Sequence, residues 1–264
     1  MTVGIERLAV YVPQYALRLT DLALARGVAP EKLTAGLGVR EMAVAAPCED
    51  VVTMAATAGA RLLRGARVDP AEIGMLVVAT ETGVDHSKPV SIFVHDLLGI
   101  GSRCRVYELK HACYAGTAAL MSAADWARAG SGRRALVIAA DIARYALRSP
   151  GEPTQGAGAV AMLVGAEPRA LALAPESGTF ASNVHDFWRP LDQREAIVDG
   201  KYSVECYLDA LAGAFAAYRR LEALGPGEVL TDRLARVLYH APFPKMAMKA
   251  HRRLVELDWQ AAPS

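Results

Sequence analysis

The sequence predicts an α/β protein in which sheets are covered by helices. Short continuous runs rich in Val, Ile and Leu recur along the chain, which is typical of strands buried on both faces. Segments of helical length separate these runs, and one of them keeps its apolar residues at helical spacing. Alternation of the two kinds of segment favours a layered α/β fold.

The expected elements follow one another along the chain. A helix at 51–63 precedes a strand at 75–80, and a second helix at 117–129 precedes strands at 135–140 and 160–164. A third helix at 203–224 carries its apolar residues on one face. These residues are Val204, Tyr207, Leu208, Leu211, Phe215 and Tyr218. A last strand is expected at 237–239.

A change in composition near Glu167 indicates a boundary, and we expect two halves at 1–167 and 168–264. Glu81 directly follows the first expected strand, and His240 directly follows the last. Open α/β sheets place their ligand sites at the carboxyl ends of strands. The pairing of one titratable residue with one strand end in each half suggests that the halves are related.

Composition and charge exclude several classes of protein. Hydrophobic residues make up 53% of the chain, and 29 Lys and Arg residues against 28 Asp and Glu give a net charge of +1. A neutral chain has no overall field for nucleic acid or anionic membranes. No apolar run approaches the roughly 18 residues of a membrane span. Without paired cysteines or a signal segment, we expect a soluble cytoplasmic protein.

Cys113 is the first candidate for chemistry. It directly precedes a run of small residues, AGTAA, that can start a closely packed helix. The positive end of a helix and its unpaired N–H groups lower the pKa of a thiol and can stabilise an oxyanion. A small buried hydrophobic role is the alternative for an isolated cysteine.

Six motifs follow one another along the chain: ATETGVDHSK, KHACYAGTAAL, GEPTQGAGAVAMLVG, HDFWRP, VDGKYSVECY and YHAPFPKM. Together and in this order, they resemble the motifs of the hydroxymethylglutaryl-CoA (HMG-CoA) synthase family. The resemblance covers essentially the whole chain and implies a thiolase-like layered fold of two related α/β halves. Members of the family are normally longer, so we expect the second half to be incomplete in these 264 residues.

The resemblance implies three catalytic residues: Cys113 as the acylated nucleophile, Glu81 as the general acid/base, and His240 as the residue that assists the acetoacetyl substrate. A carboxylate is needed because the methyl protons of an acetyl thioester are weakly acidic, and a water-poor pocket raises its basicity. Taken in isolation, Glu81 is more typical of a solvated or capping residue, and only the motif favours the catalytic role. His240 alone reads equally as a core histidine.

The implied reaction condenses acetyl-CoA with acetoacetyl-CoA through an acetyl-Cys113 thioester to give HMG-CoA of the mevalonate pathway. It requires no metal or redox cofactor. The family resemblance also implies a homodimer. No nucleic acid or membrane partner is expected.

Because CoA is a polyanion, a neutral protein must bind it with local basic residues. By resemblance the CoA and substrate ligands are Lys32, Thr154, Ser203, Lys245 and Lys249. Lys245 and Lys249 share one face if a helix starts there. Each lysine alone reads as a solvated surface charge. The resemblance also implies four pocket residues, Asp141, Tyr145, Asp186 and Phe187.

Two alternative functions stay open. One is a β-branching homologue that performs the same condensation on intermediates carried by an acyl carrier protein in polyketide assembly. The other is an inactive thiolase-fold module that only binds or dimerises. The segments of the family that complete the acetoacetyl site, one containing Asn and one a Ser/Gly loop, are absent from the sequence. The other three thiols, those of Cys48, Cys104 and Cys206, are expected to be structural.

Overall fold

The structure is a computed structural model and describes residues 1–130, 132–222, 224 and 227–262. The chain divides into two compact units. The first comprises residues 1–16, 43–143 and 155–175, and the second comprises 17–42, 144–154 and 176–264. The predicted boundary near Glu167 stays a prediction.

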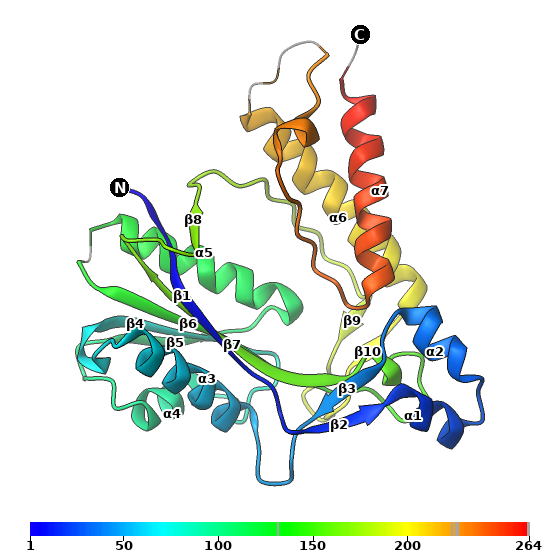
Figure 1. Ribbon diagram of the computed structural model, residues 1–264, viewed down its shortest axis with the longest axis horizontal. Coiled ribbons are helices and arrows are strands. Elements are labelled where there is room, and N and C mark those ends of the chain that lie inside the picture. Colours follow the sequence, from blue (N-terminus) through cyan, green and yellow to red (C-terminus); the bar gives the residue numbers. More distant parts are fainter. Residues whose placement is uncertain (131, 223, 225–226, 263–264) are drawn as a thin grey trace. The chain divides into compact units, whose positions relative to one another are not determined.

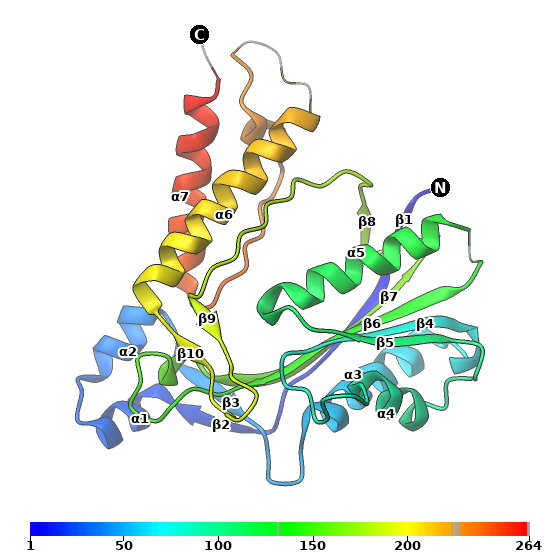
Figure 2. The same cartoon turned by 180° about the vertical axis from the view of Figure 1, so that it is seen from behind.

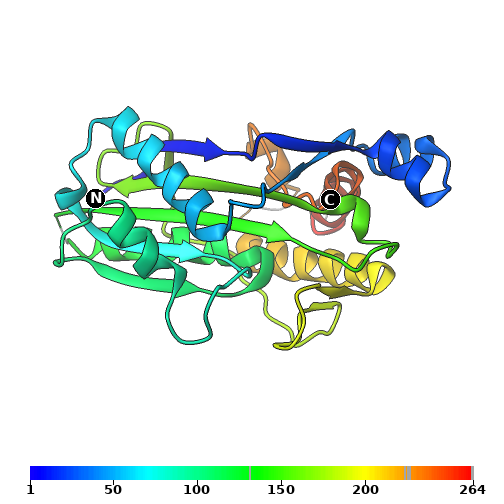
Figure 3. The same ribbon diagram turned by 90° about the horizontal axis from the view of Figure 1, so that it is seen from below.

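The first unit is built on a six-stranded mixed sheet in the order β5-β4-β6-β7-β1-β8. β4 runs parallel to β5 and β6, whereas β7 is antiparallel to β6 and β1. Figure 3 shows strands of this sheet side by side, seen from below. Their bounds are β1 Val3–Tyr11, β4 Ile73–Ala79, β5 Arg105–Leu109, β6 Arg134–Ala143, β7 Gly156–Gly165 and β8 Leu171–Leu173.

Helices cover both faces of this sheet. α3 (Val51–Ala66) and α4 (Val90–Leu97) lie on one face, and α5 (Ala115–Arg128) lies on the other (Figure 1). Alternate residues of each strand point to opposite faces. Leu76 and Val78 therefore pack with α3 and α4, while Met75, Val77 and Ala79 pack with α5. All seven residues of β4 are buried, which confirms the prediction of a strand buried on both faces.

Local sequence explains where the helices of this unit begin. Asp50 and Thr53 form a reciprocal capping box at the start of α3, which satisfies two otherwise unpaired backbone N–H groups. α5 buries only alanines, and a Cβ added at Gly116 would lie 3.3 Å from the Ala139 side chain of β6. The small residues of α5 therefore permit the close approach of helix and sheet that the sequence predicted.

The second unit is mainly helical. α6 (Gly200–Leu221) and α7 (Pro244–Gln260) lie side by side (Figure 2), and Phe215 and Leu254 form an apolar cluster with Leu230 of the 3-10 turn η4 (Leu230–Arg233). α1 (Leu19–Arg26) and α2 (Pro30–Leu37) enclose a smaller cluster. Short strand pairs complete the chain: β2 (Tyr15–Arg18) with β3 (Glu41–Val44), and β9 (Phe187–Trp188) with β10 (Ile197–Val198).

The predicted strands at 75–80, 135–140 and 160–164 and the three predicted helices are confirmed. The strand predicted at 237–239 is wrong: this segment has no regular secondary structure and leaves Leu238 92% exposed. An apolar run becomes a strand only where a neighbouring strand takes up its backbone hydrogen bonds. The described residues provide no such neighbour for it.

Candidate active site

The carboxyl ends of three adjacent strands of the first unit bring together Glu81, Cys113 and Asp141. Glu81 follows β4, Asp141 lies near the end of β6, and Cys113 lies in the 3-10 turn η2 (Ala112–Tyr114) between β5 and α5. β4 lies between β5 and β6 in the sheet. The register pairs Ala79 with Leu109, so the segments that carry Glu81 and Cys113 leave neighbouring strand ends.

Asp141 organises this edge of the sheet. Its Oδ1 atom accepts hydrogen bonds from the Thr80 hydroxyl at 2.8 Å, the Glu81 backbone N–H at 2.9 Å and both the hydroxyl and the backbone N–H of Thr82 at 2.8 and 3.1 Å. Burial raises the pKa of Asp141, and these hydrogen bonds partly oppose the shift. One oxygen atom thus fixes the backbone on both sides of Glu81.

The turn that carries Cys113 has an uncommon backbone conformation. Ala112 has φ +41°, in the left-handed region that residues with a Cβ rarely adopt. Backbone of this kind occurs at functional sites because the surrounding structure must enforce it. Cys113 follows at once and is exposed, while Ala115, the first residue of α5, is buried. The structure therefore presents the thiol at the N-terminal end of α5, as the sequence predicted.

Two aromatic residues close to Cys113 in sequence contact each other. The rings of His111 and Tyr114 meet edge to face with centroids 5.1 Å apart. Half-exposed Glu108, at the end of β5, accepts a hydrogen bond from the backbone N–H of Val90 at 2.7 Å, which ties the start of α4 to the same strand. The loop that follows Glu81 is thereby held at both of its ends.

His240 lies in the second unit, in the irregular segment before α7. The hydroxyl of Tyr207 donates a hydrogen bond to the His240 carbonyl at 2.8 Å, and the two rings stack with centroids 6.3 Å apart. His240 keeps access to solvent, yet the protein atoms around it lower the pKa of its imidazole by desolvation. The neutral imidazole that results presents one hydrogen-bond donor and one hydrogen-bond acceptor.

The proposed CoA ligands of the second unit come from three helices and a turn. Lys32 is exposed on α2, and Ser203 is half-buried near the start of α6. Lys245 and Lys249 are exposed one turn apart on α7, which confirms that a helix begins there and aligns them. Thr154 ends the short 3-10 turn η3 (Glu152–Thr154).

Contacts within the second unit connect α2 to α7. Gly38, which ends α2 with φ +81°, packs against Pro244 at the start of α7, and a Cβ added there would lie 3.2 Å from the Pro244 side chain. The helix of Lys32 therefore ends where the helix of Lys245 begins. The structure thus brings together the two helices that carry the three predicted lysine ligands.

Three of the four predicted pocket residues belong to the second unit. Tyr145 and Phe187 meet edge to face with centroids 6.4 Å apart. Asp186 precedes Phe187, and its carbonyl accepts a hydrogen bond from the Asp199 N–H at 2.9 Å. Asp141, the fourth, lies in the first unit. The roles of all twelve predicted site residues stay predictions.

Sequence reasoning missed Thr80 and Thr82, which donate to Asp141, and the buried Glu152, which contacts Arg26. The sequence Thr-Glu-Thr directly after a buried strand could have indicated that Thr80 and Thr82 belong to the site, because ligand sites lie at the carboxyl ends of such strands. No local pattern could have found the contact of Glu152 with Arg26, because 126 positions separate them.

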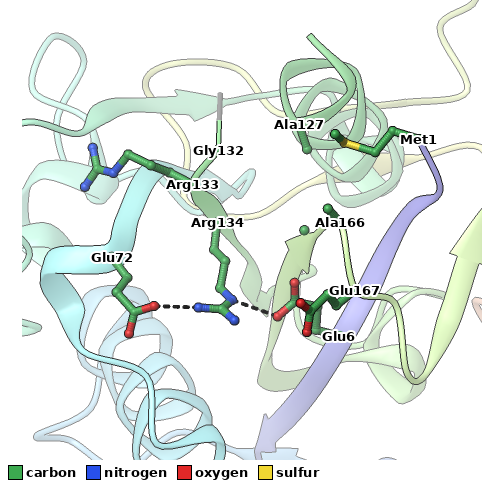
Figure 4. A pocket seen from close by; sticks show the side chains of 10 residues that line it. Met1, Glu6, Glu72, Ala127, Gly132, Arg133, Arg134, Ala166 and Glu167 are labelled. Carbon is green, nitrogen blue, oxygen red and sulfur yellow. Dashed lines mark hydrogen bonds and ion pairs between the residues drawn. The ribbon is translucent and has the colours of Figure 1, made fainter. Parts of the chain in front are cut away.

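A pocket of about 320 Å³ lies elsewhere in the first unit, at the amino ends of β4 and β6 (Figure 4). Arg134 spans it, with ion pairs to Glu6 at 2.8 Å and Glu72 at 2.5 Å. Because Asp141 lies at the opposite end of β6, this pocket is separate from the cluster around Glu81.

Within the described residues, no group of three or more His, Cys, Asp and Glu side chains forms a candidate metal site. In the same part of the chain, no helix combines the length and apolar character that crossing a membrane requires.

Family models match nearly the whole chain. The model for the N-terminal part of hydroxymethylglutaryl-coenzyme A synthase matches residues 1–169, and the model for its C-terminal part matches 174–264. A hydroxymethylglutaryl-CoA synthase of Enterococcus faecalis is 41% identical over 250 residues, which cover 95% of this chain and 63% of that protein. The chain thus spans about two thirds or less of the length of such curated relatives.

Solved structures agree with this match. A structure described as MvaS in complex with 3-hydroxy-3-methylglutaryl coenzyme A is 53% identical and superposes with a TM-score of 0.94 over 97% of this chain and 63% of that one. The HMG synthase of the curacin biosynthetic pathway, in complex with its acetyl donor carrier protein, is 32% identical with a TM-score of 0.90 over 100% of this chain and 64% of that one.

Proposed function

Because the chain belongs to the hydroxymethylglutaryl-CoA synthase family, we propose that it serves the condensation of acetyl-CoA with acetoacetyl-CoA to HMG-CoA, the reaction of the mevalonate pathway. The observation that carries the proposal is the hydrogen bonding of Asp141 to the backbone of Glu81, beside the strand end that leads to Cys113. A general base and an exposed thiol on adjacent strand ends are what an acetyl-enzyme mechanism needs.

In the first step the sulfur of Cys113 attacks the acetyl-CoA carbonyl. A new thioester forms on Cys113, the bond to CoA sulfur breaks, and the thiol proton leaves with CoA. The N-terminal end of α5 and the exposure of Cys113 support this role. Unpaired backbone N–H groups at a helix start stabilise both a thiolate and an oxyanion.

In the second step the carboxylate of Glu81 removes a methyl proton, and the resulting carbon nucleophile bonds to the ketone carbon of acetoacetyl-CoA. The alkoxide takes up a proton, and water then hydrolyses the thioester and restores the thiol. Neutral His240 hydrogen-bonds the acetoacetyl group in this account, consistent with its lowered pKa. CoA thioesters and water are the only reactants proposed.

The charge pattern of α7 supports CoA binding by lysine. The first turn of α7 carries Lys245 and no acidic residue. A cation at the positive end of a helix destabilises the helix, so a role in stability does not explain the presence of Lys245 there. Binding of an anionic ligand such as CoA does explain it. The proposed compartment is the cytoplasm and the proposed assembly is a homodimer.

The second candidate is a synthase that accepts carrier-protein thioesters. The curacin HMG synthase, solved in complex with a donor carrier protein, superposes on this chain with a TM-score of 0.90, close to the 0.94 of the structure described with HMG-CoA. The identity to the structure described with HMG-CoA is higher, 53% against 32%, which favours CoA as the carrier. An inactive binding module is the third candidate.

One experiment separates the three. The chain is incubated with radiolabelled acetyl-CoA together with acetoacetyl-CoA, with acetoacetyl carrier protein, or with neither, and Cys113→Ser is run in parallel. Labelled HMG-CoA supports the proposal, and labelled carrier protein alone replaces it with the second candidate. Absence of label on the protein and in both products supports the inactive module.

A further inference from the structure

Two charged side chains are fully buried in the described part of the chain, Glu152 and Asp258. Asp258 joins α7 to the backbone of η4 and to Arg219 of α6, and serves the packing of those helices. Glu152 lies in η3, in the connection 144–154 that also carries Tyr145 and Thr154. Its surroundings point to a role in ligand binding.

The carboxylate of Glu152 is fully engaged. Arg26, in the last turn of α1, donates from Nε to Oε2 at 2.8 Å and from a terminal nitrogen to Oε1 at 2.5 Å. The backbone N–H of Arg148 donates to Oε2 at 3.0 Å. The hydrogen bonds from Arg26 are the largest cause of the lowered pKa of Glu152. A bidentate ion pair of this kind fixes the orientation of the guanidinium relative to the carboxylate as well as the distance between them.

The connection that Glu152 holds is energetically costly. Arg148 has φ +67°, and the hydroxyl of Ser149 is buried without a hydrogen-bond partner. A Cβ at position 151 would lie 2.8 Å from the ring of Tyr145, so only Gly151 fits there. A strained backbone and unpaired buried polar groups persist only where the surrounding contacts hold the segment in place. Segments of this kind are found disproportionately often at ligand-binding sites.

We infer that the Arg26–Glu152 pair is a positioning clamp for the CoA thioester, an inference that rests on the proposed function. The pair joins two segments that carry predicted ligands: the 144–154 connection with Tyr145 and Thr154, and the α1–α2 pair with Lys32. Thr154 is held in turn, since its hydroxyl donates to the Gly151 carbonyl at 2.8 Å.

The clamp predicts a specific kinetic signature. Because the pair holds segments that carry predicted CoA ligands, its loss should weaken the binding of acetyl-CoA and leave the chemistry of the Cys113 thiol unchanged. Glu152→Gln should raise the KM for acetyl-CoA about tenfold, as expected for one charged hydrogen bond. The maximal rate of Cys113 acetylation should change by less than about twofold.

A matched control exists at the start of the same helix, where Arg18 is the N-cap residue of α1. Arg18 pairs with Asp21 at 2.9 Å, but both side chains are largely exposed. Arg18→Gln should leave the KM unchanged, because exposed ion pairs contribute little. The exchanged pair, Arg26→Glu with Glu152→Arg, should recover part of the lost affinity. It also provides a folded variant if Glu152→Gln does not fold.

Two further measurements keep the inference independent of turnover. Calorimetry with CoA alone should show the same tenfold loss, and hydrogen exchange should accelerate at the amides of 148–154 and not in β4. A lowered melting temperature with unchanged KM and unchanged CoA affinity would overturn the clamp and leave a structural role. If the wild-type chain binds CoA but never acetylates Cys113, the proposed function fails, and the calorimetric comparison still decides the clamp.

Discussion

The Oδ1 atom of Asp141 accepts a hydrogen bond from the backbone N–H of Glu81 across an N···O distance of 2.9 Å. This bond connects the ends of β4 and β6 at the sheet edge where β5 leads to Cys113. Because the same oxygen also receives both threonines that flank Glu81, the backbone of Glu81 cannot shift without breaking several hydrogen bonds.

Asp141→Ala should therefore damage both stability and condensation. It removes the acceptor of the Thr80 and Thr82 hydroxyls and of the Glu81 backbone N–H. One unsatisfied buried group costs about 1–3 kcal/mol. Urea denaturation measures this loss. Asp141→Asn retains an acceptor oxygen and is the matched control. Equal stability of the Ala variant and the wild type would contradict a positioning role for Asp141.

Glu81→Ala should separate acetylation from condensation. Without the carboxylate, Cys113 still takes the acetyl group, but its methyl protons no longer exchange with solvent deuterium and no product forms. The expected loss of condensation is about 10² to 10⁴-fold, the usual contribution of a positioned base. Proton exchange followed by mass spectrometry reports the step directly. Normal condensation would exclude Glu81 as the base.

Replacement of Lys245 and Lys249 by Ala should weaken CoA binding by about tenfold each, the scale of one charged hydrogen bond. The fold should not suffer, because Lys245 opposes the dipole of α7. Calorimetric titration with CoA and thermal unfolding of the same samples test both statements. A drop in stability with unchanged CoA affinity would make the lysines structural.

His240 predicts a pH dependence of stability. Desolvation lowers its folded pKa below 6.5, so the unfolded chain binds a proton at a pH where the folded chain does not. The contribution of His240 to the free energy of unfolding is therefore greatest above pH 6.5. It declines as the pH falls from 6.5 toward the folded pKa, because the unfolded chain then takes up the proton more readily. Unfolding measured between about pH 5 and 8 should lose this slope in His240→Gln. An unchanged slope would show that other groups cause it.

The sequence predicted β4, β6, β7, α3 and α5 of the first unit because each of them carries its own pattern, but it did not predict β1, β5, β8 or α4. β4 is apolar throughout since helices cover both of its faces, and α5 is rich in alanine since it approaches the sheet closely. The segment 237–239 has the same apolar pattern, but its backbone finds no neighbouring strand. Strand formation depends on a partner that local sequence does not reveal.

Candidate site residues could be selected from the sequence where they belong to motifs. They could not be selected where their role depends on contacts between segments distant in sequence. Cys113, Glu81 and His240 each stand at a position that the sequence could single out. The contact of Glu152 with Arg26 and the fourfold role of Asp141 Oδ1 depend on how distant segments fold together. Such contacts have no periodicity, and only the structure identifies them.

Acetylation of Cys113 is the most direct test of the proposed chemistry. The chain is treated with acetyl-CoA, digested and analysed by mass spectrometry, with Cys113→Ser as the control. Burial raises the pKa of the Cys104 thiol, which makes it a poor nucleophile, whereas Cys113 is exposed at the start of α5. We predict one acetyl group, on Cys113, that is absent from the Ser variant. Acetylation of Cys48, Cys104 or Cys206 in its place would contradict the account.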